Sequence, residues 1–144
     1  MKTIVIAYGS TTGNTESVAQ LIAGHLSAFN TTVVDISALQ IEQVTAADCV
    51  LLGSSTWGYG ELQDDFATYL PQITAQVYGG KQVAVFGCGD QAAFSEVFCE
   101  AVTQIEAQLQ KSGAVLAVEG LRVDGDVSDN LEAIEAFSKA IAGL

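Results

Sequence analysis

The sequence predicts an α/β sandwich, in which helices cover both faces of a parallel β-sheet. Two observations support this fold class: short apolar runs rich in β-branched residues recur along the chain, and helical patterns separate them. The runs are near-continuous rather than alternating, as is typical of strands buried on both faces of a parallel sheet. The five predicted strands cover residues 3–7, 32–36, 49–52, 82–86 and 115–118.

Apolar residues recur at helical spacing after the first, third, fourth and fifth of these strands. The four segments cover residues 18–29, 62–73, 98–109 and 131–141. The 144 residues are enough for one domain with a sizeable core, and neither a linker nor a repeat divides them. We therefore predict a single domain over residues 1–144.

The composition excludes several classes of function. Five basic residues stand against 17 acidic ones, a formal net charge of −12, so nucleic acid and anionic membranes would repel the chain. No apolar stretch approaches the roughly 20 residues of a membrane helix, and no signal peptide begins the chain, which predicts a cytoplasmic protein. Three cysteines without Cys-x-x-Cys spacing and the single His25 predict neither a disulfide framework nor a metal site.

The loop after the first strand is the most unusual segment of the chain. In parallel sheets, ligands bind beyond the carboxyl ends of the strands, where the strand order reverses. Residues 8–16 of this loop contain four Ser or Thr hydroxyl side chains, two glycines and an amide at the start of a predicted helix. Hydroxyls and free backbone N–H groups at a helix N-terminus form an anion site. The alternative is a capping loop, with Asn14 or Thr12 as the cap, but the density of hydroxyls favours phosphate.

Two other phosphate loops do not match this segment. A P-loop needs Gly-Lys-Ser/Thr, and no lysine lies between Lys2 and Lys81. The dinucleotide motif G-x-G-x-x-G is absent because Gly9 and Gly13 have the wrong spacing. A loop without a cation must hold phosphate by hydrogen bonds, which suits a monoester better than a triphosphate with its magnesium.

The run Ser10, Thr11, Thr12, Gly13, Asn14 and Thr15 resembles the phosphate-binding loop of the flavodoxins, small electron carriers that contain FMN. The resemblance extends from Ile4 into the last helix, and the length is similar to that of short-chain members. It implies a three-layer sandwich with a five-stranded parallel sheet of order 2-1-3-4-5. It also implies non-covalent FMN, with its phosphate wrapped by the hydroxyls and amides of these six residues.

The loop after the third strand contains the only tryptophan, Trp57, among small residues and glycines. Alone, this tryptophan is equally compatible with a stacking surface and a loop anchor. The resemblance implies that Trp57 covers one face of the isoalloxazine ring, with Ser54, Ser55, Thr56 and Tyr59 as further cofactor contacts. It also implies that the Gly58 peptide turns over on one-electron reduction, so that its carbonyl accepts a hydrogen bond from N5–H of the semiquinone. Glycine suits that position because the turned peptide needs φ above zero.

The loop after the fourth strand begins with Gly87-Cys88-Gly89-Asp90. A plain interpretation is a turn in which Asp90 caps the next helix. The resemblance implies that backbone groups of Cys88, Gly89 and Asp90 meet the pyrimidine edge of the ring. Phe94 is then predicted to cover the second ring face, although counting back from the helix places Ser95 there instead.

These loops together predict an electron carrier and not an enzyme. The predicted function is low-potential one-electron transfer by FMN, mainly between semiquinone and hydroquinone, with no catalytic residue. The alternative is an FMN-dependent reductase such as a quinone reductase, which the closure of both ring faces by Trp57 and Phe94 argues against. We expect a monomer whose acidic residues steer it onto basic faces of a flavodoxin reductase and of electron acceptors. Those residues are Glu61, Asp64, Asp65, Asp90 and Glu96.

Overall fold

The computed structural model describes residues 2–10, 13–57, 61–89 and 99–144. Its strands are β1 (Thr3–Gly9), β2 (Asn30–Asp35), β3 (Cys49–Trp57), β4 (Glu61–Leu62), β5 (Gln82–Gly89), β6 (Val115–Leu116) and β7 (Leu121–Asp124). Its α-helices are α1 (Asn14–His25), α2 (Ile41–Ala46), α3 (Asp64–Tyr69), α4 (Ala75–Tyr78), α5 (Glu100–Lys111) and α6 (Leu131–Ala142). Short 3₁₀ turns cover Ile36–Ala38, Leu70–Gln72 and Val127–Asn130.

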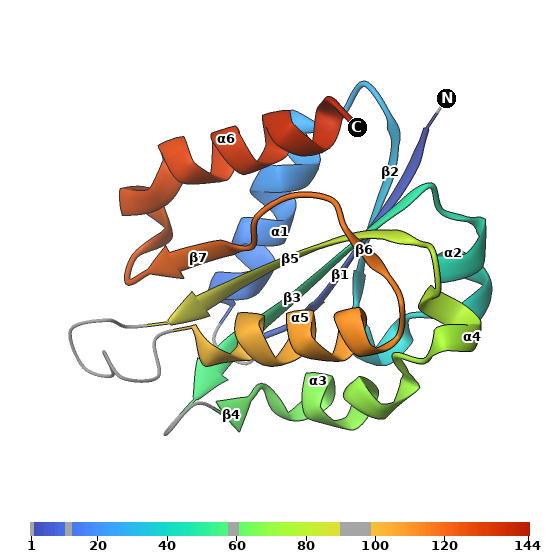
Figure 1. Cartoon of the computed structure of the whole chain (residues 1–144). Helices are drawn as coiled ribbons and strands as arrows, with labels where there is room; N and C mark the ends of the chain where they lie inside the picture. The colour runs from blue at the N-terminus through green and yellow to red at the C-terminus, as the bar shows by residue number, and fades with distance from the viewer. Residues whose placement is uncertain (1, 11–12, 58–60, 90–98) are drawn as a thin grey trace.

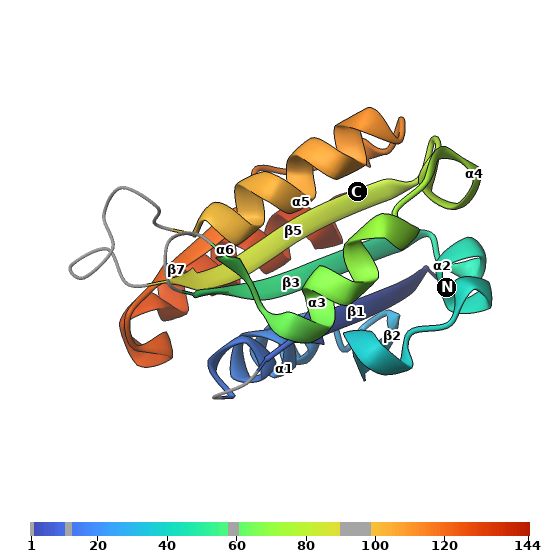
Figure 2. The same ribbon diagram turned by 90° about the horizontal axis from the view of Figure 1, so that it is seen from below.

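The main sheet is parallel and follows the order β2-β1-β3-β5-β6, with β7 also paired to β5 (Figure 1). Helices α1 and α6 pack on one face, and α3 and α5 lie on the other, which Figure 2 views. The predicted three-layer fold and strand order are therefore confirmed. The predicted fifth strand at 115–118 is wrong in its bounds, because the edge strand consists of two pieces, β6 and β7, that pair with the two ends of β5.

Gly120, between the two pieces of the edge strand, lies in close contact with α5. The last ladder bond of the first piece runs from the Ala117 N–H to the Val83 carbonyl at 3.1 Å. A Cβ atom on Gly120 would lie 2.9 Å from both the Val102 and Glu106 side chains of α5. The chain therefore passes close beneath α5 before β7 begins at Leu121.

Three strands extend further into the predicted loops than their apolar runs indicated. Strand β1 continues to Gly9, β3 to Trp57 and β5 to Gly89. Backbone pairing needs no apolar side chain, and Ser54 and Ser55 pair with Gly87 and Cys88 across the sheet. The loop predicted to begin at residue 53 was therefore placed too early.

Helices α2 and α4 were not predicted, because they contain only six and four residues and leave too short a pattern to recognise. The cap of α2 is reciprocal: Gln40 and Gln43 bind each other's backbone N–H groups. The second predicted helix, 62–73, is shorter in the structure, since Leu62 belongs to β4 and the chain turns into a 3₁₀ helix at Leu70.

Candidate functional site

The carboxyl ends of β1 and β3 lie at the point where the connections diverge. Helix α1 follows β1 over one face of the sheet, whereas α3 follows β3 over the other (Figure 1). The register places Gly9 beside Ser54, and Ser55 beside Cys88. The three predicted loops therefore start from the same edge of the sheet, the one formed by the carboxyl ends of its strands. Doubly wound sheets bind their ligands in the crevice at this kind of switch point.

The start of α1 presents backbone donors at this edge. Gly13 takes the left-handed conformation, with φ 95°, and its N–H donates to Ser10 Oγ at 3.0 Å. The first helical bond runs from the Ser17 N–H to the Gly13 carbonyl, so helix geometry leaves the N–H groups of residues 14–16 without an intrahelical acceptor. Asn14 is the first helical residue and not the cap, which removes one form of the capping alternative.

This donor set favours an anion that is held by hydrogen bonds. No lysine or arginine occurs between Lys2 and Lys81 in the sequence. Lys81 donates to the Thr45 and Ala47 carbonyls at 3.3 and 2.7 Å, and Arg122 pairs with Glu106 at 3.3 Å. The 12-residue α1 adds the positive end of its dipole to the donors. An FMN phosphate monoester therefore fits this helix start.

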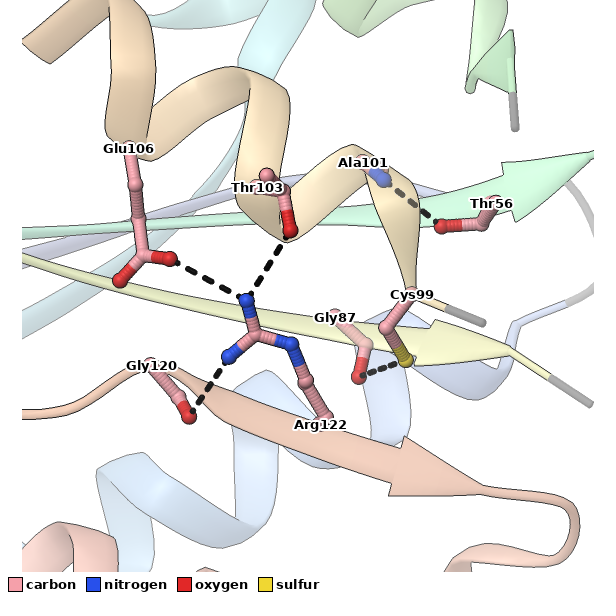
Figure 3. A network of polar contacts seen from close by, with 8 residues as sticks. All are labelled: Thr56, Gly87, Cys99, Ala101, Thr103, Glu106, Gly120 and Arg122. Carbon is pink, nitrogen blue, oxygen red and sulfur yellow. Dashed lines mark hydrogen bonds and ion pairs between the residues drawn. The ribbon is translucent and has the colours of Figure 1, made fainter. Parts of the chain in front are cut away.

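The three hydroxyls at the end of β3 each bind a different neighbouring element. Ser54 Oγ accepts the Gln63 N–H at 3.1 Å, and Ser55 Oγ lies 2.8 Å from Thr15 Oγ1 in the first turn of α1. Thr56 Oγ1 accepts the Ala101 N–H of α5 at 3.0 Å (Figure 3). Ser54, Ser55 and Thr15 are buried. These side chains therefore join the elements around the edge, and their contact with a cofactor stays a prediction.

The end of β3 forms an antiparallel hairpin with β4. Trp57 pairs with Glu61, and Thr56 pairs with Leu62, in an antiparallel arrangement. Gly58 and Tyr59, which follow Trp57 in the sequence, lie outside the described residues. Thr11 and Thr12 of the first loop also lie outside them. The backbone turn at Gly58 and the stacking of Trp57 stay predictions.

Cys88 lies in β5 beside the edge, with 6% of its surface exposed. Burial raises the pKa of its thiol to about 11, although a hydrogen bond to Thr15 opposes the shift. The thiol is therefore protonated at neutral pH, which disfavours a role as a nucleophile. Gly89 ends β5, whereas Asp90 and Phe94 lie outside the described residues.

Two features of the edge were missed by the sequence analysis. Gln63 is buried, its Oε1 accepts the Phe66 N–H at 3.1 Å, and a Cβ atom on Gly9 would overlap its side chain. The Tyr8 hydroxyl donates a hydrogen bond to Glu16 Oε2 at 2.9 Å. Burial, together with this bond, raises the pKa of Tyr8 to about 12. Neither pair follows a sequence pattern, because the partners meet only after β1, α1 and α3 have assembled.

The described residues contain no group of three or more His, Cys, Asp or Glu side chains that could hold a metal ion. Within the same residues, no helix is both long and apolar enough to span a membrane.

The fold and the site together define a doubly wound α/β protein with open backbone donors of α1 at its topological switch point. The flavodoxin family model matches residues 6–137, and the chain therefore belongs to the flavodoxin family. A flavodoxin of Maridesulfovibrio salexigens is 42% identical over 134 residues, which are 88% of this chain and 88% of that protein. Other curated relatives are longer, and the match spans 63 to 67% of their length.

Solved structures agree with this assignment. Oxidised flavodoxin 2 of Bacillus cereus superposes with a TM-score of 0.89 at 39% identity, over 99% of both chains. A flavodoxin of Fusobacterium nucleatum bound to flavin mononucleotide has a TM-score of 0.86 at 21% identity, over 99% of this chain and 98% of that one, and shows the shared fold. The family resemblance seen in the sequence is thereby confirmed.

Proposed function

We propose that this chain, as a single domain over residues 1–144, transfers single electrons with one non-covalently bound FMN. The observation that supports this function most directly is the hydroxyl-rich, cation-free start of α1 at the switch point of a flavodoxin sheet. When bound, FMN supplies the redox chemistry, because its isoalloxazine ring accepts and releases one electron at a time. The protein supplies the binding geometry and the electrostatics.

The first loop holds the phosphate. Backbone N–H groups of residues 14–16 and the hydroxyls of the 10–15 segment donate to the phosphate oxygens, and the α1 dipole stabilises their charge. Ser10 supports the left-handed conformation of Gly13 by accepting its N–H. Hydrogen bonds in this arrangement replace the lysine that a P-loop would use.

The second and third loops hold the ring. Trp57 and Phe94 cover its two faces, and backbone groups of Cys88, Gly89 and Asp90 meet its pyrimidine edge. The Gly58 peptide would turn so that its carbonyl accepts a hydrogen bond from the N5–H group of the ring. The reductase alternative is not favoured, since the relatives are named flavodoxins, and flavodoxins are electron carriers that act with redox partners.

An acidic surface beside the ring loops recognises the partners. Glu61, Asp64 and Asp65 are exposed on β4 and the first turn of α3, next to the backbone pair of Trp57 and Glu61. Their charge suits the basic faces of a flavodoxin reductase and of electron acceptors, which a monomer in the cytoplasm would meet by diffusion. Asp90 and Glu96, also predicted for this surface, lie outside the described residues.

The experiment that tests the cofactor is an FMN titration of the apoprotein, followed by anaerobic reduction one electron at a time. We expect one equivalent of FMN to bind and the yellow protein to turn blue after the first electron. Bleaching in a single two-electron step would favour the reductase. Failure to take up FMN would contradict the proposed function.

The partner surface is tested by reversing one charge in two matched places. Asp64 and Glu42 are exposed acidic residues in the first turns of the six-residue helices α3 and α2. Asp64→Lys should lower the electron-transfer rate from a flavodoxin reductase at low salt and weaken its salt dependence, whereas Glu42→Lys should change neither. Equal effects of the two variants would show that only the net charge matters.

A further inference from the structure

Cys99, the residue at the cap position of α5, makes no side-chain cap bond to this helix. Cys99 occupies the cap position in the left-handed backbone conformation, with φ 51°. Residues other than glycine rarely adopt this conformation. Its thiol lies 3.8 Å from the Gly87 carbonyl of β5 and 3.8 Å from the Val123 carbonyl of β7. This residue thus fixes the chain where it returns from the 90–98 segment (Figure 3).

The cap comes instead from another strand. Thr56 Oγ1 of β3 accepts the Ala101 N–H at 3.0 Å, across 45 residues of sequence, and this N–H is one of the first-turn donors that a helix leaves open. Thr56 immediately precedes Trp57, which begins the first ring loop. Ala101 lies two residues after Cys99, where the second ring loop ends.

The helix start is also held at a close distance from the sheet. A Cβ atom on Gly87 would lie 2.6 Å from the Ser54 carbonyl oxygen and 2.6 Å from Val102 Cγ2 of α5. Val102 and Ala101 are both fully buried. The Thr56–Ala101 bond therefore joins two packed elements, and its donor residue is fully buried.

We propose that Thr56 is a positioning residue, whose hydroxyl holds the end of β3 and the start of α5 at a fixed spacing through Ala101. This inference rests on the proposed function for the identity of the two ring loops. It gives the Thr56 hydroxyl a role other than a direct contact with FMN. The end of β3 and the start of α5 flank the loops proposed to hold the isoalloxazine ring, whereas the start of α1 is held through Ser10, Gly13 and the Thr15–Ser55 pair.

The test compares ring binding with phosphate binding in Thr56→Val, Thr56→Ser and Thr31→Val. Thr31 is the matched control, since its Oγ1 donates to the Leu26 carbonyl at 2.9 Å, between α1 and β2 and away from the ring loops. Riboflavin, which lacks the phosphate, is titrated by fluorescence quenching. Inorganic phosphate is titrated by the NMR shift of the Gly13 amide.

We expect Thr56→Val to raise the Kd for riboflavin about tenfold, because a buried donor loses its acceptor, and to leave the Kd for phosphate within about twofold. Thr56→Ser keeps the acceptor and should bind like the wild type, as should Thr31→Val. Riboflavin binding by Thr56→Val at the wild-type level, or equal weakening of riboflavin and phosphate, would overturn the proposal.

A measurement on the unaltered protein keeps the proposal testable if Thr56→Val does not fold. The Ala101 amide should exchange slowly in the apoprotein and at least as slowly with riboflavin bound. Faster exchange on riboflavin binding would show that the ligand takes the Thr56 hydroxyl, which contradicts a positioning role. If the wild type binds neither FMN nor riboflavin, the proposed function fails; if only the Thr56 results differ, the positioning role fails alone.

Discussion

The two faces of the sheet are covered in different ways. On one face, the 12-residue helices α1 and α6 pack apolar side chains against β1, β3 and β5 (Figure 1). On the other, the short helices α2, α3 and α4 accompany α5 (Figure 2). Buried polar bonds are added there, such as the Tyr69–Tyr78 hydroxyl pair at 2.6 Å and the bond from Ser112 Oγ to the Ile73 carbonyl at 2.9 Å.

The difference follows from helix length. A 12-residue helix presents three turns of one apolar face, so packing alone can hold it on the sheet. Helices of four or six residues bury too little surface for that, and side chains from neighbouring elements tie their ends down. We therefore expect the α1 and α6 face to be most sensitive to shape, and the other face to be most sensitive to loss of polar partners.

The largest expected effect is a shape change on the α1 and α6 face. Gly53 of β3 pairs with Phe86 of β5, and a Cβ atom on Gly53 would overlap the fully buried Phe86 ring. Gly53→Ala should lower the free energy of unfolding by about 3 kcal/mol, because the ring must leave its packed position. Urea unfolding followed by circular dichroism measures this loss.

A matched alanine on the same face serves as the control. Gly24 is exposed in α1, and nothing lies within 4 Å of the position of its missing Cβ. Gly24→Ala should stabilise the protein by about 0.5 to 1 kcal/mol through helix propensity. If both alanines changed stability by the same amount, the overlap at Gly53 would not be the cause of the loss.

The next effect concerns the polar pair on the other face. Tyr78 is fully buried and Tyr69 is 7% exposed, and burial raises the pKa of both hydroxyls. Tyr78→Phe leaves the Tyr69 hydroxyl without this partner, so stability should fall by about 1 to 2 kcal/mol. The double variant with Tyr69→Phe should lose less than the sum of the single variants. Additive losses would show that the pair does not act as a unit.

Alkaline pH gives a third effect, and its sign follows from the buried thiols. Burial raises the pKa of Cys49 from an ordinary 9.0 to about 11. Between these values the unfolded chain releases a proton that the folded chain keeps, so the contribution of Cys49 to stability is constant below pH 9 and falls from pH 9 to 11. Cys49 alone should contribute a slope of about 1.4 kcal/mol per pH unit.

Urea unfolding at pH 8, 9.5 and 10.5 measures that slope, and Cys49→Ala should make it shallower. The variant keeps the remaining slope from Cys88 and Cys99, whose thiol pKa values are also raised by burial, to about 11 and about 12. An unchanged slope in Cys49→Ala would mean that this thiol ionises as easily in the folded chain as in the unfolded one.

The sequence predicted the fold and the strand order of the sheet, but not the whole candidate site. The apolar runs of β1, β3 and β5 and the stripes of α1, α5 and α6 are local patterns, so they were recognisable before folding. The roles of Ser54, Ser55 and Thr56 depend on partners at Gln63, Thr15 and Ala101, which are 9, 40 and 45 residues away. Hydroxyls in a loop look alike in a sequence, whether they bind a ligand or a neighbouring helix.

The split edge strand was beyond prediction for a related reason. Residues 115–118 carry the apolar character of a strand, yet β6 ends at Leu116 and the chain passes close to α5 at Gly120 before β7 begins. Nothing local to that segment records the position of Val102 and Glu106. The family resemblance supplied the general order of the sheet, whereas this contact belongs to the packing of one helix.

The smallest expected effect concerns the ion pair that joins β7, the second piece of the edge strand, to α5. Arg122 of β7 reaches Glu106 and Thr103 of α5 at 3.3 and 3.1 Å, and its side chain is 32% exposed (Figure 3). Because water screens such a pair, Arg122→Ala should cost only about 0.5 kcal/mol, and less in 0.5 M salt than in 0.05 M. Glu106→Gln, which keeps the shape, should cost no more. A loss above about 2 kcal/mol, independent of salt, would mean that Arg122 holds β7 by packing, as shape holds the α1 and α6 face.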